Sequence, residues 1–137
     1  MKVVHDTNVV VSGLLHSEGN PGQILALAFS GAVQICHDER ILAEYREVLA
    51  RPRLKLNSER VKEVLVKLES DGTSVRPGAE KWNLPDADDE PFLAVTFAAP
   101  ADHLITGNIR HYPAAQRKGC SVVTPAEFME IWRQASR

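Results

Sequence analysis

The hydrophobic positions along the chain follow two alternating patterns. Short runs rich in apolar and β-branched residues occur at positions 3–5, 33–36, 103–106 and 121–123. Such runs are typical of strands that are buried on both faces of a sheet. The chain is therefore predicted to contain several short core strands, and the first of them ends at Asp6.

Between these runs, apolar residues recur every three or four positions, which predicts helices. The predicted helices cover residues 24–29, 39–49, 58–71 and 92–99, and the stretch that follows Thr124. The last helix has the pattern of a capping box, with Thr124 before it, Pro125 at its first position and Glu127 two residues later. The stretch from Gly19 to Gly22 is predicted to be a turn, and a weak strand is predicted at Val75.

This order of elements predicts the fold class. Strands that alternate with helices form βαβ units, whose strands lie parallel and whose helices cover the sheet. We predict an α/β protein with three layers, α/β/α, around a mostly parallel central sheet of four to five strands. The chain has 137 residues and no linker-like stretch, so residues 1–137 are predicted to form one domain.

Composition narrows the class of protein. With 44% hydrophobic and 25% charged residues, the chain is globular rather than disordered. Its formal net charge of -2 means that any nucleic acid must be bound by a local basic patch. The sequence has no apolar run of roughly 18 residues and no signal-peptide pattern, which predicts a cytoplasmic protein without a membrane partner. Cys36 and Cys120 lack metal-ligand spacing and suit free thiols in a reducing compartment.

Acidic residues stand where these elements end or face the sheet. Ligands of parallel α/β proteins bind beyond the carboxyl ends of the strands, so Asp6 is well placed for function. The alternative is that Asp6 only caps or turns the chain. Glu44 lies roughly 40° around its helix from Val48 and so borders the apolar stripe. An ordinary edge position or a salt bridge is the alternative for Glu44.

The stretch 86–90 adds four acids in five residues at the start of a buried helix. Acids favour helix N-termini, but capping needs only one or two. Gathering carboxylates costs about 4 kcal/mol per pair at 4 Å and an effective dielectric of 20, and a divalent cation offsets this cost. Oxygen ligands indicate Mg²⁺ or Mn²⁺ rather than zinc. These ions activate water and neutralise phosphoryl charge, which predicts metal-assisted phosphodiester hydrolysis.

Four motifs together resemble PIN-domain proteins. They are Asp6-Thr7-Asn8 after the first strand, Glu44, the run from Asp86 to Leu93, and Leu104-Ile105-Thr106-Gly107-Asn108. The similarity spans nearly the whole chain. It is greatest to the VapC-like ribonuclease toxins of toxin-antitoxin systems.

The resemblance implies a set of site residues. The catalytic, metal-binding acids would be Asp6, Glu44 and Asp89, with Asp88 and Asn108 as further metal ligands and Asp86 as a substitute within the run of acids. Thr7 and Asn8 would orient Asp6 and bound water. Many family members have Asp where this chain has Asn108, which can coordinate through its carbonyl oxygen but brings no charge.

The resemblance also implies a reaction and partners. Water activated by one or two Mg²⁺ ions would attack an RNA phosphodiester. The residues expected to bind the RNA backbone are Arg51, Arg53 and Arg110, although such basic groups are often only solvated surface. Tyr112 is the nearest aromatic residue for base stacking. An antitoxin protein and a second copy of the chain, in a homodimer, are the expected protein partners, and Trp82 is an apolar anchor that could serve either.

Two other function classes remain open. One is a phosphohydrolase with Asp6 as covalent nucleophile, although Asn8 stands where that chemistry usually needs a second Asp. The other is a non-catalytic PIN-like module that binds RNA or protein, in which Asn108 reflects lost activity.

Overall fold

The computed structural model of the protein describes residues 1–136. Its strands form one sheet in the order β3-β2-β1-β4-β5, and every neighbouring pair is parallel. The strands are β1 (Lys2–His5), β2 (Gln34–His37), β3 (Thr73–Ser74), β4 (His103–Ile105) and β5 (Val122–Val123). The predicted parallel sheet of four to five strands is therefore confirmed.

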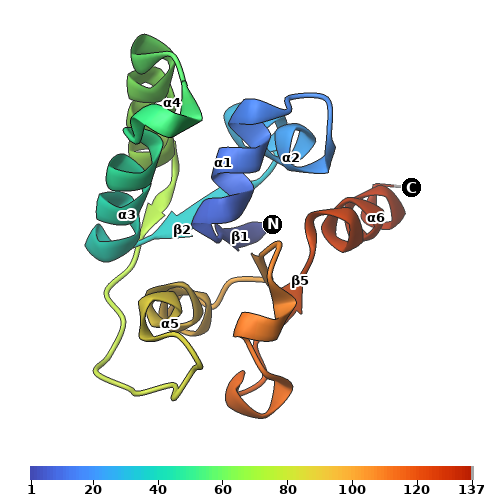
Figure 1. The fold of residues 1–137 in the computed structure, drawn as a ribbon. Coiled ribbons are helices and arrows are strands. Elements are labelled where there is room, and N and C mark those ends of the chain that lie inside the picture. The colour runs from blue at the N-terminus through green and yellow to red at the C-terminus, as the bar shows by residue number, and fades with distance from the viewer. Residues whose placement is uncertain (137) are drawn as a thin grey trace.

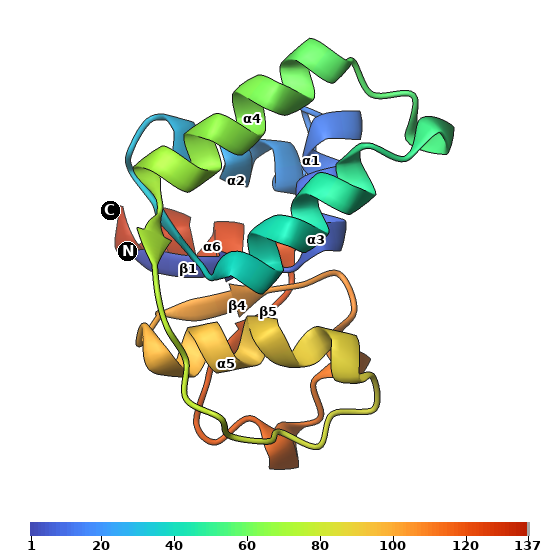
Figure 2. The ribbon, with the colours of Figure 1, turned by 90° about the vertical axis from the view of Figure 1, so that its left-hand side faces the viewer.

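Helices cover both faces of this sheet (Figures 1 and 2). They are α1 (Thr7–Leu15), α2 (Asn20–Phe29), α3 (Glu39–Leu49), α4 (Ser58–Asp71), α5 (Glu90–Ala98) and α6 (Pro125–Ala135). In Figure 2, α1 to α4 lie above the sheet and α5 lies below it, against β1, β2 and β4. This arrangement confirms the three-layer α/β/α fold. The longest helix in the described residues, α4, has only 14 residues, and no helix there could cross a membrane.

The first half contains two differences from the sequence-based prediction. The apolar pattern did not predict α1, because the run Val9-Val10-Val11 has β-branched side chains that locally favour a strand. Val9 and Val10 are buried in the helix instead, so packing overrides propensity. The predicted turn from Gly19 to Gly22 is wrong, since Asn20 already begins α2 with Pro21 in its first turn, a favourable place for proline.

Gly13 explains how α1 and α2 come together. A Cβ atom at this position would lie 2.6 Å from Leu25 Cδ1 and 2.9 Å from the carbonyl oxygen of Pro21. Only glycine therefore allows so close an approach of the two helices. The helix pair fixes α1, which begins directly after Asp6.

Near Val75 the structure also differs slightly from the prediction. The strand covers Thr73–Ser74 and pairs with Cys36 and His37 of β2. Val75 lies just beyond it, although its N–H still donates to the carbonyl of His37. The predicted weak strand therefore exists, displaced toward the N-terminus.

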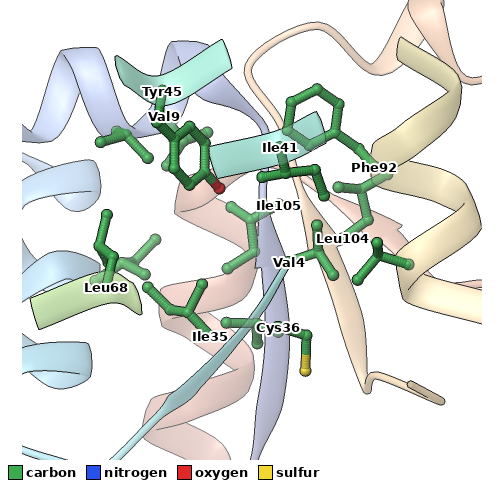
Figure 3. Packing of buried hydrophobic residues seen from close by; sticks show 14 of the residues in the cluster. Val4, Val9, Ile35, Cys36, Ile41, Tyr45, Leu68, Phe92, Leu104 and Ile105 are labelled. Carbon is green, nitrogen blue, oxygen red and sulfur yellow. The ribbon is translucent and has the colours of Figure 1, made fainter. Parts of the chain in front are cut away.

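The core lies on both sides of β1. Val4 of β1 and Leu104 of β4 are fully buried, and Figure 3 shows them between Tyr45 of α3 and Phe92 of α5. The strands are buried on both faces because helices cover both, which explains their nearly continuous apolar runs. The apolar core leaves the carboxyl ends of β1 and β4 as the place where polar side chains meet.

Candidate functional site

Asp6 lies where the ends of β1 and β4 meet. His5 and Ile105 pair across these parallel strands, so the residues that follow them, Asp6 and Thr106, are neighbours. The Thr106 hydroxyl donates to Asp6 Oδ2 at 2.8 Å. The Tyr112 hydroxyl donates to the same oxygen at 3.0 Å. Asp6 is thus a buried carboxylate held by two hydroxyl groups from the segment that follows β4.

Glu44 reaches the same edge from α3. The Thr7 hydroxyl, one residue after Asp6, donates to Glu44 Oε2. The neighbouring Tyr45 hydroxyl donates to the carbonyl of His5. These bonds join α3 to the end of β1. Glu44 is half-buried, and the structure thus places it toward the sheet rather than on the outer face of its helix.

The acids at the start of α5 have different surroundings. Asp86 Oδ1 accepts a hydrogen bond from the backbone N–H of Asp88 at 2.9 Å. Glu90 Oε1 accepts one from the backbone N–H of Trp82 at 3.1 Å. Asp88 is exposed. The Asp89 side chain is only 13% exposed, and its Oδ2 lies 2.9 Å from His111 Nδ1. Asp89 is therefore the acid of this run that faces inward.

The charge of Asp6 affects the pKa values of the two other inward acids, Glu44 and Asp89. Burial, followed by the charge of Asp6, raises the pKa of Asp89 to about 6. Burial also raises the pKa of Glu44, and the charges of Asp6 and Asp88 add to this effect. The pKa of Asp6 is raised by burial and partly lowered by its bonds from Thr106 and Tyr112. Asp6 after β1 thus lies within electrostatic reach of Glu44 in α3 and of Asp89 just before α5.

The donor set fits a hard divalent cation. The inward acids offer only oxygen, the ligand that Mg²⁺ and Mn²⁺ prefer. Asp89 Oδ2 is buried, and His111 Nδ1 lies 2.9 Å from it. Within residues 1–136, no three acidic, imidazole or thiol side chains already stand in a metal-binding arrangement.

The other predicted residues of the site contact different groups than expected. Thr7 bonds to Glu44, and Asn8 Oδ1 accepts the Gly107 N–H at 2.9 Å, so neither hydroxyl nor amide reaches Asp6. Asn108 is exposed and its N–H donates to the Thr106 hydroxyl at 3.0 Å. Asn8, in the first turn of α1, thus links this helix to the turn that follows β4.

Three residues that contact the acids were not predicted to do so. They are Thr106, His111 and Tyr112. Tyr112 was predicted to stack on a base, and this is wrong because the residue is fully buried. Thr106 lies within the motif at the end of β4, so its position in that motif was the available signal. No local pattern marks His111 or Tyr112, since their partners lie in distant parts of the sequence.

The basic residues occupy two separate places. Arg51 and Arg53 follow the end of α3 and are exposed, and Arg51 pairs with Glu47 at 2.8 Å. Arg110 is also exposed and lines a surface hollow formed by residues 107–111. His111 of this hollow contacts Asp89, so the hollow that Arg110 lines adjoins one of the acids. Trp82, for which a place in the core or at an interface was open, is a core residue buried against Phe97.

Fold and site together define a parallel α/β protein with acidic side chains at the carboxyl ends of its strands. A family model for the PIN domain matches residues 2–110. The match covers more than half of the chain, and the chain therefore belongs to the PIN domain family.

Two comparisons extend this result. "Uncharacterized protein MJ1680" from Methanocaldococcus jannaschii is 30% identical over 141 residues, covering 95% of this chain and 90% of that protein. A chain in the crystal structure of VapBC2 from Rickettsia felis, bound to a DNA fragment from its promoter, has a TM-score of 0.58 and 16% identity. The match covers 90% of this chain and 98% of that chain. The predicted family is confirmed, and the likeness to a VapBC protein holds at the level of the fold.

Proposed function

We propose that the protein is a metal-dependent endoribonuclease that hydrolyses RNA phosphodiester bonds and is the toxin of a toxin-antitoxin pair. The observation that carries the proposal is the convergence of Asp6, Glu44 and Asp89. These acids come from three separate elements, and the charge of Asp6 raises the pKa of the other two. Such crowding is costly in a protein that binds no cation there.

In this proposal Asp6, Glu44 and Asp89 hold the metal through carboxylate oxygens. Asp88 and Asn108 are further ligands at the exposed rim. A bound Mg²⁺ or Mn²⁺ lowers the pKa of its water and offsets the charge that develops on the phosphoryl group. The raised pKa of Asp89, about 6 through burial and the charge of Asp6, supports this assignment, because a cation would offset the cost of these charges.

RNA is the proposed substrate, bound through its phosphates. Arg110 borders the acids through the hollow at residues 107–111, and it provides a cation for the backbone of the strand. Arg51 and Arg53 extend this contact in the proposal. The proposed protein partners are an antitoxin and a second copy of the chain, and the proposed location is the cytoplasm. The fold shared with a chain of VapBC2, whose structure was solved with a DNA fragment from its promoter, supports the toxin-antitoxin part.

Cleavage of RNA by the purified protein with Mg²⁺, Mn²⁺ or EDTA tests the proposal. We expect cleavage with either ion and none with EDTA. Glu44→Gln is expected to abolish cleavage, whereas Glu47→Gln, the same change on an exposed residue of the same helix, is expected to leave it near the wild-type rate. Equal loss in both variants, or cleavage in EDTA, would contradict the proposal.

A non-catalytic RNA- or protein-binding module is the second function considered. It is favoured by the neutral Asn108 and by the lack of a ready metal arrangement in residues 1–136. RNA binding that survives both EDTA and Asp6→Asn, with no cleavage by the wild type, would support this second function.

A further inference from the structure

Tyr112 places a hydroxyl on the proposed catalytic acid from inside the core. Its ring is fully buried, and its hydroxyl lies 3.0 Å from Asp6 Oδ2. Thr106 donates to the same oxygen at 2.8 Å. Both donors therefore use Oδ2, and neither uses Oδ1.

The two donors are themselves fixed by the segment that carries them. The Asn108 N–H donates to the Thr106 hydroxyl at 3.0 Å. At the other end, the Tyr112 carbonyl accepts Arg117 Nε at 2.8 Å, and the Tyr112 N–H donates to the Ile109 carbonyl. A buried ring with an anchored backbone can hold its hydroxyl in one place.

The chemistry of these groups assigns the direction of both bonds. A phenol has an ordinary pKa of about 10 and is a protonated donor at neutral pH. An ionised carboxylate only accepts, and hydroxyl bonds to it are stronger than bonds between neutral groups. Partners of this kind orient a metal-binding side chain, and their loss typically weakens metal affinity by about 10- to 100-fold.

We propose that Tyr112 is a positioning residue, which together with Thr106 holds Asp6 by Oδ2 and leaves Oδ1 to bind the cation. This inference rests on the proposed metal-dependent function. It goes further because it gives a buried aromatic residue, outside the set of acids, control over the affinity of the site. If Tyr112 only packed in the core, phenylalanine at this position would leave the metal affinity unchanged.

Tyr112→Phe separates these two roles, since it removes the hydroxyl and keeps the ring. The matched control is Thr96→Val. Thr96 is also buried, but its hydroxyl donates to the carbonyl of Phe92 at 2.7 Å rather than to a carboxylate. Both variants lose one buried hydroxyl bond, and only Tyr112→Phe frees Asp6.

The experiment titrates the full-length protein with Mn²⁺ and measures the free ion by electron paramagnetic resonance, with circular dichroism to verify folding. We expect the Kd for Mn²⁺ to rise about tenfold in Tyr112→Phe and to change less than about twofold in Thr96→Val. RNA cleavage by Tyr112→Phe is expected to recover at saturating Mn²⁺. A Kd for Tyr112→Phe within twofold of the wild type, or an equal rise in both variants, would overturn the inference.

Asp6→Asn distinguishes this failure from failure of the proposed function. If Asp6→Asn binds Mn²⁺ as the wild type does, or the wild type binds none, the proposed function and this inference both fall. If binding depends on Asp6 but not on Tyr112, only the inference falls. Should Tyr112→Phe not fold, Thr106→Val removes the other donor to Oδ2, and an unchanged Kd in that variant would overturn the assignment of Oδ2.

Discussion

His111 Nδ1 lies 2.9 Å from Asp89 Oδ2, and this contact joins the turn after β4 to the start of α5. It identifies Asp89 as the inward acid among several neighbours in the sequence. Asp86 holds the backbone of its own turn instead. The segment that includes Thr106, His111 and Tyr112 therefore contacts both Asp6 and Asp89, and the geometry of the acids depends on it.

Removing the charge of Asp89 is expected to abolish cleavage and stabilise the metal-free protein. In the folded protein the pKa of Asp89 is raised from 3.8, its value in the unfolded chain, to about 6. Protonated Asp89 therefore stabilises the fold fully below pH 3.8. This stabilisation is lost as pH rises through 6. At pH 7 we expect Asp89→Asn to raise the free energy of unfolding of the metal-free protein by about 1 kcal/mol, a value reduced because the side chain is partly exposed. Thermal melts in EDTA measure this, with Asp6→Asn expected to shift in the same direction.

Asp88→Asn is the control for this prediction. Asp88 is exposed in the same turn, and we expect its metal-free melting temperature to change less than that of Asp89→Asn. A loss of several degrees in Asp89→Asn and Asp6→Asn would contradict the idea that their charges are crowded.

Adding a carboxylate at the end of β4 is expected to tighten metal binding. Asn108→Asp supplies a charged ligand in place of a neutral one, and we expect the Kd for Mg²⁺ to fall roughly tenfold, or about 1.4 kcal/mol. Isothermal titration calorimetry measures this. Asn20→Asp makes the same change at the start of α2 and should leave the Kd unchanged. Identical titrations for the wild type and Asn108→Asp would show that residue 108 does not coordinate the ion.

Acid is expected to destabilise the protein through its buried histidines. His5 is fully buried with no hydrogen bond to either ring nitrogen, and burial lowers its pKa to about 4. Burial also lowers the pKa of His37. The histidines of the unfolded chain bind protons more readily than the buried ones. The free energy of unfolding is therefore at its full value above pH 6.5 and declines as the pH falls toward 4. The decline for His5 is at most about 1.4 kcal/mol per pH unit.

Denaturant unfolding from pH 7.5 to pH 4.5 measures this decline. His5→Leu should flatten the dependence, whereas His16→Leu, at an exposed position, should not. The comparison of variants is necessary because Asp89 takes up a proton in the same range with the opposite effect on stability. An equal slope in the wild type and His5→Leu would refute the assignment to His5.

Trp82→Ala is expected to cost about 3–5 kcal/mol of folding free energy, because Trp82 is a core residue. Its ring meets Phe97 edge-on at 5.4 Å, and Lys118 Nζ lies 4.5 Å from its ring centroid. Urea unfolding measures the loss, and Val66→Ala at an exposed site of α4 should change stability by less than about 0.5 kcal/mol. A stable Trp82→Ala variant with an altered oligomeric state would instead support a role at an interface.

Much of the architecture could be predicted because it is encoded in local patterns. The apolar run before Asp6 and the nearly continuous apolar stretch 92–99 each determine an element without help from distant residues. The helix α1 could not be predicted in this way. Val9 and Val10 favour a strand by themselves, and burial against the rest of the core decides for a helix.

The sequence by itself determined the alternation of strands and helices, the family, and the acids that stand where elements begin or end. Only the tertiary structure decided which acids turn inward and that Tyr112 bonds to Asp6. The reason is physical: periodicity reports the burial of one element at a time. Contacts such as those of Tyr112 with Asp6 and His111 with Asp89 arise only when parallel strands bring distant segments to the same edge.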